Sequence, residues 1–570
     1  MSYLGAKVMI FVWLNYVVHS SGAKILMYSE KQADGDFSLL SALARGLVEN
    51  GHCVTALVSD HHYEELKNDI AYSHLKFDVF ADSTTTFVKK DPCRSPSRRC
   101  LHSQTSVSGV LMTRHQQTIA GSLTMCSYLL DHVLTQRNQG ARYDLLIVDA
   151  HKGCSILLAG VLDVPYILVV PRGIEPSLSR RVGAPDTTAY FPEISSGLSH
   201  KMNFRQRVFN TISSFYKDLS LFIANDVYLF LFNFKYEIRV PINRVISNAQ
   251  LVLINSDFAI DFPFPLAPNA VAVGGLTTRE PKPLDEEWVE LISPTGEGVV
   301  LVTLGIKDTS AGARSGIQIA DLTKLSRAFA AIPQLIVWQM KEEPPVSLQL
   351  SSNIRIVKWM PQNDLLGHPS LKALVFHGGN NGMYEALYHG VPMVVMPLIY
   401  DHPDVAARVV DRGMGVVVDF FSFTSEELTL AIQTVINNSS YRHHTQRVSA
   451  IFKAHPQPPL ERAAFWIEHV MKYGGDYLRS SRTDLYIWQV YSLDVYAFLL
   501  LLVYLSYRVL KFCVVRRYHR HFLAAIFTCL KLPLRCLSPL GLRHVIGSSI
   551  GWGVTGRLRK RWTSSSVVKV

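Results

Sequence analysis

The sequence predicts an α/β protein in which two Rossmann-like domains face each other across a cleft, followed by a transmembrane helix. Three observations lead to this prediction. Short apolar strands alternate with helical segments in two separate series, a stretch rich in proline and glycine separates the series, and a long apolar run follows them.

The first series opens with the β-α-β pattern of a parallel sheet. Strand 24–30 (KILMYSE) is followed by helix 37–52 and strand 53–59 (CVTALVS). Further buried-strand candidates occur at 144–150, 166–170 and 251–256. We therefore place an N-terminal domain at 23–265.

The stretch 262–283, which is rich in proline and glycine, indicates the connection between the domains. Beyond it, strand candidates occur at 299–306, 335–340, 354–359, 373–376 and 394–396. We place the C-terminal domain at 266–480.

The chain has 570 residues, too many for one core, and a formal net charge of +11. The excess charge belongs to the C-terminal end. From Arg508 onward there are 13 Lys and Arg and no Asp or Glu, which leaves 44 basic and 46 acidic residues before it. A body so balanced in charge argues against nucleic-acid binding.

Two apolar runs predict the topology. The run 8–18 is followed by small residues, which favours a signal peptide at 1–22; an uncleaved anchor is the alternative. The run 487–507 is long enough to cross a bilayer, so we place a transmembrane helix at 487–510. Basic residues follow it, which predicts a cytosolic tail at 511–570 and a luminal body.

Cysteine spacing gives no metal site, and among the eight cysteines Cys93 and Cys100 are the most plausible local bridge. Asn437 and Asn438 begin two overlapping glycosylation sequons, of which one could be used.

The run 359–402 carries most of the functional information. The strand candidate 373–376 leads into His377-Gly378-Gly379-Asn380-Asn381-Gly382, which opens a helix. Glycines let a phosphate approach the backbone, and the helix N-terminus supplies N–H groups and positive charge. His377 could add a hydrogen bond to a phosphate oxygen. This combination predicts an anion site.

The same run resembles the donor-binding signature of the UDP-glycosyltransferases, the family of the glucuronosyltransferases and ceramide galactosyltransferase. Looser resemblance extends over about 23–515. It implies the two-domain GT-B architecture, with the N-terminal domain binding the acceptor and the C-terminal domain binding the UDP-sugar. The implied donor-site residues are Thr303, Gly305, Trp359, Gln362, His377, Gly379, Asn381, Gly382, Glu385, Asp401 and His402.

In the family, by this resemblance, the tryptophan stacks on uracil and the glutamine bonds its edge, while the glutamate holds the ribose. The aspartate and its neighbour touch the sugar. The leaving group is handled by backbone N–H groups, so we expect no metal and no cofactor beyond the UDP-sugar co-substrate.

The catalytic base departs from the family pattern. Asp36 stands where the family has a histidine, and Asp149 matches that histidine's partner acid. Two close carboxylates repel, which raises the pKa of one, so Asp36 could act as a base or the pair could be inactive. Asp149 could also be a structural cap, and we interpret His151 as incidental.

Other departures concern the donor. Ile306 replaces a serine of the phosphate loop, Gln339 stands where a basic residue is common, and Phe376 replaces a threonine. His402 replaces the usual glutamine, as it does in ceramide galactosyltransferase. The resemblance therefore favours a hexose over glucuronic acid.

Residues 209–236 hold nine Phe and Tyr. They predict buried helix faces, or alternatively an acceptor pocket or a membrane-facing helix pair. We expect an inverting hexosyltransferase of the endoplasmic reticulum membrane that acts on a lipophilic hydroxyl compound. The alternative is a catalytically weak homologue that binds UDP-sugar or pairs with active relatives in oligomers.

Overall fold

The structure is a computed structural model that describes residues 22–30, 35–81, 125–151, 153–236, 242–293, 296–305, 319–341 and 343–530. The chain forms two compact units, Met1–Asp484 and Leu485–Val570, and each is described by itself. The expected signal peptide at 1–22 lies almost wholly outside the described residues. So do Ile306, Cys93, Cys100 and the last forty residues of the tail.

The first sheet has seven parallel strands in the order β3-β2-β1-β4-β5-β6-β7. Its central strands are buried along almost their whole length, as expected when helices cover both faces of a parallel sheet. The strands are β1 (Lys24–Tyr28), β2 (Cys53–Ser59), β3 (Lys76–Phe80), β4 (Leu145–Asp149), β5 (Tyr166–Val170), β6 (Leu251–Ile254) and β7 (Ala270–Ala272).

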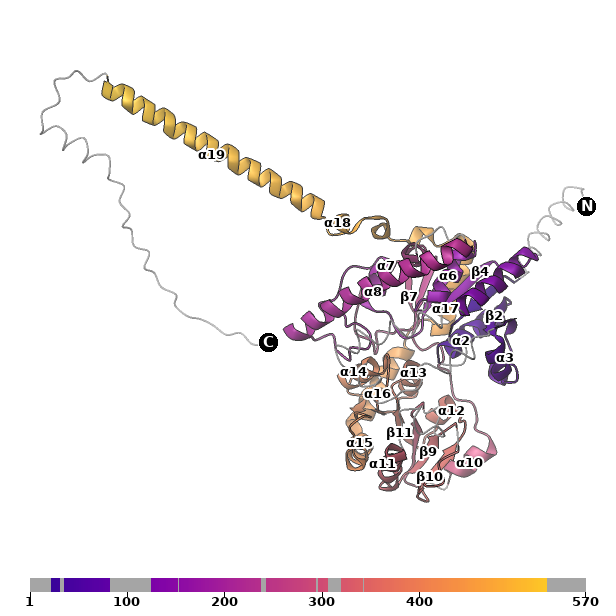
Figure 1. Ribbon diagram of the computed structural model, residues 1–570. Helices are drawn as coiled ribbons and strands as arrows, with labels where there is room; N and C mark the ends of the chain where they lie inside the picture. Colours follow the sequence, from indigo (N-terminus) through magenta and orange to yellow (C-terminus); the bar gives the residue numbers. More distant parts are fainter. Residues whose placement is uncertain are drawn as a thin grey trace, which may run out of the picture. The chain divides into compact units, whose positions relative to one another are not determined.

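The helices of the first half connect these strands (Figure 1). They are α2 (Gly35–Glu49), α3 (Asp60–Leu66), α6 (Gly153–Val161), α7 (Pro176–Val182), α8 (Phe204–Tyr236) and α9 (Ile242–Ser247). The aromatic segment at 209–236 belongs to α8, which is one long helix and not a helix pair.

The second sheet has six parallel strands in the order β10-β9-β8-β11-β12-β13. The strands are β8 (Val299–Thr303), β9 (Leu335–Gln339), β10 (Ile354–Val357), β11 (Leu371–Phe376), β12 (Met393–Val395) and β13 (Gly415–Val417). The helices around them are α10 (Glu286–Ile292), α11 (Ile319–Ala330), α12 (Gln362–Leu366), α13 (Asn380–Tyr388), α14 (His402–Asp411), α15 (Ser425–Asn437) and α16 (Ser439–Lys453).

The chain returns to the first sheet after the second is complete. Helix α17 (Pro459–Tyr473) buries Ala463, Ala464 and Ile467 in the same core cluster as Ile25 of β1. Apolar residues at helical spacing make this possible. The two halves are thus tied by a second crossing in addition to the connection near 262–283. The expected domain boundaries stay predictions, although β7 shows that the first sheet continues past residue 265.

One disulfide lies within the described residues and was not expected from the sequence. It joins Cys126 to Cys154 of α6. Cys53 is a free thiol.

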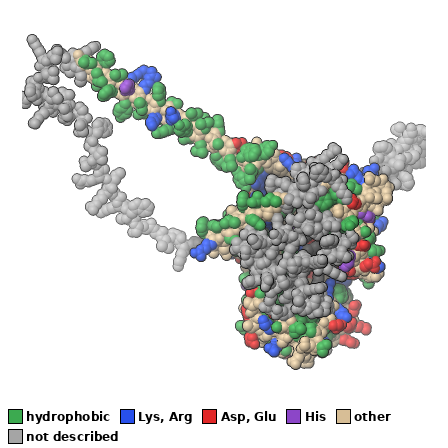
Figure 2. Space-filling view, viewed as in Figure 1, with side chains coloured by type: hydrophobic (Ala, Val, Ile, Leu, Met, Phe, Trp, Pro, Cys, Tyr) green, Lys and Arg blue, Asp and Glu red, His purple; other side chains and the backbone are tan. Residues whose placement is uncertain are grey.

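The second unit is helical where it is described. A short helix, α18 (Ile487–Val490), precedes α19 (Leu493–Leu530). The segment Leu493–Thr528 is long and apolar enough to cross a membrane. Figure 2 shows its hydrophobic side chains, with basic ones among its later turns. The helix starts six residues after the expected position 487 and continues beyond 510, because the basic residues after Arg508 also favour helix.

Candidate functional site

Four of the predicted site residues lie at the carboxyl ends of strands, at the place in each sheet where the order of the strands reverses. In the first sheet the order reverses between β1 and β4; Asp36 follows β1 and Asp149 ends β4. In the second it reverses between β8 and β11; Gly305 follows β8 and His377 follows β11. Ligands of open parallel sheets bind at such switch points, beyond the carboxyl ends of the strands.

The glycine turn after β11 has the backbone shape that the sequence argument requires. Gly378 has a φ of 93°, and a Cβ there would lie 3.0 Å from the carbonyl oxygen of His402. Gly379 then precedes α13, whose first-turn N–H groups start at Asn380. Gly305, with a φ of 64°, lies close to the ring of His377. The turn therefore admits only glycine at Gly378 and leads directly into a helix N-terminus.

His377 is fixed by the strand beside it. Its Nδ1 lies 3.1 Å from the carbonyl oxygen of Thr303. Because a carbonyl only accepts hydrogen bonds, Nδ1 carries the proton and donates it. Burial lowers the pKa of His377, although this bond and Asp401 oppose the effect. A neutral His377 therefore presents an unprotonated Nε2, which must gain a proton before it can donate to a phosphate.

His402 has the opposite tautomer. Its Nδ1 accepts hydrogen bonds from the backbone N–H groups of Leu398, at 3.3 Å, and Ile399, at 3.1 Å. The neutral ring therefore carries its proton on Nε2 and can donate from that atom. The ring meets that of His377 edge to face, with centroids 4.7 Å apart. Asp401 is buried at the N-cap of the same helix, α14.

Glu385 and Gln362 contact each other directly. The side-chain amide of Gln362 donates to Glu385 over 2.7 Å. Burial raises the pKa of Glu385 to about 7, while hydrogen bonds from Gln362 and Thr277 and the charge of Arg279 act in the other direction. The expected uracil and ribose contacts thus lie side by side on α12 and α13. Trp359, in the loop before α12, is 69% exposed and offers an accessible ring face.

One departure from the family pattern, Gln339, contacts the predicted donor-site residue Thr303 in the second sheet. Thr303 donates from its hydroxyl to the side-chain oxygen of Gln339 over 3.4 Å. The strand pair β8 and β9 places them opposite each other.

Asp36 is paired with an arginine that the sequence argument missed. Arg172, just after β5, donates from Nε to Asp36 over 3.2 Å and also from Nη2 to its second carboxylate oxygen. Both side chains are largely buried. This two-bond geometry offsets the charge of Asp36. Repulsion by Asp149 is the expected reason for one of the two carboxylates to hold a proton. The charge of Arg172 offsets that repulsion.

Arg172 is also the electrostatic centre of the site. Burial lowers its pKa, but the carboxylates of Asp36, Asp401 and Asp149 outweigh that effect, so its net pKa is raised. The guanidinium lies 5.1 Å from the ring centroid of Tyr400. Tyr400 has a φ of 54°, an unusual value for a bulky residue and one that often marks a functional site.

Asp149 is fully buried at the end of β4. It accepts a hydrogen bond from the backbone N–H of His151 over 2.8 Å. This bond is a capping contact of the kind that the sequence left open, and it keeps the carboxylate oriented beside the loop.

Hydrogen bonds join the two halves of the site, and one of them starts in the glycine turn. The side-chain amide of Asn381 donates to the carbonyl oxygen of Gly35 over 2.9 Å. Asn381 belongs to the glycine turn of the second sheet, and Gly35 immediately precedes Asp36 at the start of α2. Neighbouring Asn380 is buried and bonds Asn255, which follows β6. The predicted catalytic and donor residues are therefore brought together.

Within the described ranges, no group of three or more His, Cys, Asp or Glu side chains has the arrangement of a metal site. Asn437 and Asn438 are both exposed, at the junction of α15 and α16. The side-chain oxygen of Asn438 accepts from the backbone N–H of Ser440 and caps α16.

Comparison with known proteins identifies the chain's relatives. The model of the family described as UDP-glucoronosyl and UDP-glucosyl transferase matches residues 13–525. The chain belongs to this family. It is 33% identical over 512 residues to UDP-glucuronosyltransferase 2B33 of Macaca mulatta, covering 88% of this chain and 94% of that protein. It is 37% identical over 411 residues to UDP-glucuronosyltransferase 2C1 of Oryctolagus cuniculus, covering 69% and 78%.

Solved glycosyltransferases share the fold. The calicheamicin glycosyltransferase CalG4 aligns with a TM-score of 0.51 at 18% identity, covering 79% of this chain and 98% of that one. A UDP-glucosyltransferase from Polygonum tinctorium aligns with a TM-score of 0.54 at 16% identity, covering 80% and 98%. The predicted family and its GT-B architecture are confirmed. This member of the UDP-glycosyltransferase family is a glycosyltransferase that uses a UDP-sugar.

Proposed function

We propose that this protein is a membrane-anchored hexosyltransferase that moves a sugar from a UDP-hexose to a hydroxyl of a lipophilic acceptor, with inversion at the anomeric carbon. The observation that carries the proposal is the Asn381–Gly35 hydrogen bond. It holds Asp36, on the acceptor side, next to the glycine turn that would bind the donor's pyrophosphate.

The proposed reaction is a single displacement. The acceptor oxygen attacks the anomeric carbon and its proton passes to Asp36, while the bond from that carbon to the pyrophosphate oxygen breaks. The UDP leaving group gains negative charge, which the N-terminus of α13 and a protonated His377 stabilise without a metal or other cofactor. Attack from the side opposite the leaving group inverts the anomeric centre.

We assign the donor roles from the family resemblance, and the placement of the side chains supports them. Trp359 stacks on the uracil, Gln362 bonds its edge and Glu385 accepts from the ribose hydroxyls. Asp401 and the Nε2 proton of His402 contact the sugar. A neutral histidine donor offers no positive charge for the carboxylate of glucuronic acid, so we propose galactose or glucose as the sugar.

A small apolar cavity supports a lipophilic acceptor. It lies beside Arg172, and its wall includes Ile174, Phe191, Ile194, Phe262 and Phe264. Polar groups, among them Asp404 and Arg408, also line it. An apolar wall next to the Asp36–Arg172 pair would hold the body of an acceptor while its hydroxyl reaches the carboxylate.

We place the body in the lumen of the endoplasmic reticulum and the basic C-terminal end in the cytosol. The candidate span at Leu493–Thr528 supports an anchor, and basic residues after Arg508 support this orientation. Glycosidase should lower the mass of microsomal protein through Asn437 or Asn438. Protease added outside intact microsomes should remove only the C-terminal end.

One observation favours a second candidate function. Arg172 already binds both oxygens of Asp36, and a carboxylate so occupied is a poorer proton acceptor than a free one. The chain could then bind UDP-sugar with little turnover and act as a partner of active relatives.

A donor and acceptor screen tests the proposed function. Purified full-length protein is incubated with UDP-galactose, UDP-glucose, UDP-N-acetylglucosamine or UDP-glucuronate and a panel of lipophilic alcohols, and products are detected by mass spectrometry. Hexosylated products support the enzyme. UDP binding without any product supports the second candidate, and exclusive use of UDP-glucuronate contradicts the proposed sugar.

A further inference from the structure

Between Phe204 and Ile223, helix α8 has its polarity reversed relative to an ordinary surface helix. Its outer face carries six apolar side chains that are 42–72% exposed: Phe204, Val208, Ile212, Phe215, Leu219 and Ile223. They recur at intervals of three or four residues and so form one continuous stripe. At 1.5 Å per residue the stripe is about 28 Å long.

Between Asn210 and Ser220 the inner face of α8 is polar, whereas Phe232, further along the helix, is buried in the apolar core. Asn210, Ser213, Ser214 and Ser220 are buried on the opposite side of the helix from the stripe. A helix on a protein surface in water normally buries its apolar side and exposes its polar side. Here the buried side is the polar one. The helix does pack on the protein, but it packs with its polar side, and the apolar side faces outward.

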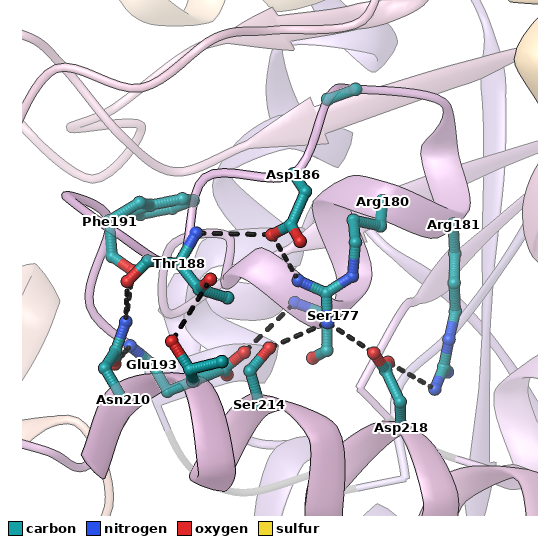
Figure 3. A network of polar contacts seen from close by, with 12 residues as sticks. Ser177, Arg180, Arg181, Asp186, Thr188, Phe191, Glu193, Asn210, Ser214 and Asp218 are labelled. Carbon is teal, nitrogen blue, oxygen red and sulfur yellow. Dashed lines mark hydrogen bonds and ion pairs between the residues drawn. The ribbon is translucent and has the colours of Figure 1, made fainter. Parts of the chain in front are cut away.

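A hydrogen-bonded and ionic network holds α8 in this orientation, as Figure 3 shows. The guanidinium of Arg180 donates to Ser214 over 2.7 Å and also to Asp218. The ammonium of Lys217 pairs with Glu175 and lies 3.6 Å from Glu193. Turning α8 to hide the stripe would separate these charged groups from their partners, which is costly for buried charges.

Most of the charges beside the stripe are positive. Arg205 and Arg207 are exposed at its N-terminal end, and so is Lys201, which lies 3.8 Å from Asp411. Asp218 is the sole acidic residue in 201–223, and it is bound by Arg180. An apolar face bordered by Lys and Arg is the pattern of a helix that lies in the interface of a bilayer, where phosphate headgroups meet the basic side chains.

The same chain supplies a bilayer. The candidate span Leu493–Thr528 is joined to the first unit by eight residues, 485–492. A membrane crossed by that span is always within reach of the first unit, which favours even a weak surface contact. We propose that the α8 stripe, from Phe204 to Ile223, lies in the interface of that bilayer.

This contact would also position the acceptor cavity. The side chain of Asn210 donates to the carbonyl oxygens of Thr188 and Phe191, each over 2.8 Å. Phe191 lines the apolar cavity beside Arg172. A bilayer under the outer face of α8 therefore lies one layer of protein away from that cavity. This consequence rests on the proposed function, whereas the membrane contact itself does not.

Hydrophobic photolabelling of the full-length protein tests the contact. The protein is reconstituted in phosphatidylcholine vesicles, with and without phosphatidylserine, and irradiated with an aryl diazirine that dissolves in the acyl chains. Trypsin releases the peptide 208–217, which carries Val208, Ile212 and Phe215. The internal reference is the peptide 413–442, which carries Leu430, an equally exposed apolar residue of α15.

We expect several-fold more label per mole in 208–217 than in 413–442. The double variant Ile212→Glu with Phe215→Glu should reduce it to the reference level, with the label in α19 unchanged. The matched control, Leu430→Glu with Ile451→Glu, adds the same charge at exposed positions of α15 and α16 and should keep the native labelling of 208–217.

Equal labelling of 208–217 and 413–442 in the native protein would overturn the proposal. A dimer in which a second copy covers the stripe would also overturn the proposal. In that case the stripe is unlabelled, and the mass of the protein in detergent corresponds to two copies but falls to one copy in the Ile212→Glu, Phe215→Glu variant. The comparison of the two peptides in the native protein decides the question even if that variant does not fold. Retained UDP binding by the variant would show that the variant folds.

Discussion

Arg172 binds both carboxylate oxygens of Asp36, and the residue before Asp36, Gly35, accepts a hydrogen bond from Asn381 in the other half of the site. From the sequence we expect two carboxylates that repel each other. The arginine turns that arrangement into a charge-compensated cluster in which Asp36, Asp149 and Asp401 surround one cation.

The pair should couple strongly in stability. Arg172→Gln leaves a buried carboxylate uncompensated, so it should lower the free energy of unfolding by about 3–5 kcal/mol. The double variant Arg172→Gln with Asp36→Asn should recover most of that loss, because neutral side chains replace both charges and no buried charge is left uncompensated. Thermal unfolding of the four proteins measures this. Losses that simply add would show that the two residues do not interact.

Glu385 should make nucleoside binding depend on pH. Its pKa is about 7 in the empty site, and only the ionised carboxylate accepts hydrogen bonds from the ribose hydroxyls at both of its oxygens. Below that value binding must first remove a proton, so uridine affinity should fall by up to about tenfold per pH unit between pH 7 and 5.5 and level off above pH 8. Calorimetry with uridine measures this, because uridine has no phosphate to titrate. Glu385→Gln should abolish the dependence; a flat native profile would contradict the assignment.

His377 should take up a proton when the donor binds, whereas Glu385 must lose one. Its Nδ1 proton is donated to Thr303, and burial keeps the ring neutral, so Nε2 must take up a proton to bind a phosphate oxygen. UDP-glucose should therefore bind with proton uptake that uridine binding lacks. Calorimetry in two buffers with different ionisation enthalpies measures the protons. His377→Gln, which can donate without titrating, should lose the uptake, and equal proton numbers for uridine and UDP-glucose in the native protein would exclude this role.

His402 should influence the choice of hexose. Its Nε2 proton is aimed by two backbone N–H groups that bond Nδ1, so the donor atom is held in one place. His402→Gln substitutes a longer, freely rotating amide and should shift the ratio of rates with UDP-galactose and UDP-glucose by several-fold. Competition of the two donors for one acceptor measures that ratio. An unchanged ratio would remove His402 from sugar recognition.

The sequence was sufficient for the features that local patterns encode. Strands β1 and β2 with α2 between them follow from strand and helix periodicity, and the turn after β11 follows from Gly378, whose φ only glycine tolerates. Arg172 could not be found in this way, because its partner lies 136 residues earlier in the chain. The one available signal was an arginine directly after a buried strand, YILVVPR, at the end of the sheet where the site forms.

The orientation of α8 was also beyond the sequence. Its aromatic residues favour burial by composition, and only the tertiary contacts of Lys217 and Arg180 decide which face turns inward. The disulfide between Cys126 and Cys154 depends in the same way on the packing of α6.

The most direct measurement is the transfer rate of Asp36→Asn beside that of Asp36→His, with UDP affinity as the control for an intact donor site. If Asp36 accepts the acceptor's proton, Asp36→Asn should lose about 10²–10⁴ in kcat at unchanged UDP affinity, the usual contribution of a general base. Asp36→His should retain transfer, since an imidazole can take the same proton. A native rate in Asp36→Asn would contradict the account. So would an inactive parent whose Asp36→His variant gains activity, which would make the protein a UDP-sugar binder that lost its base.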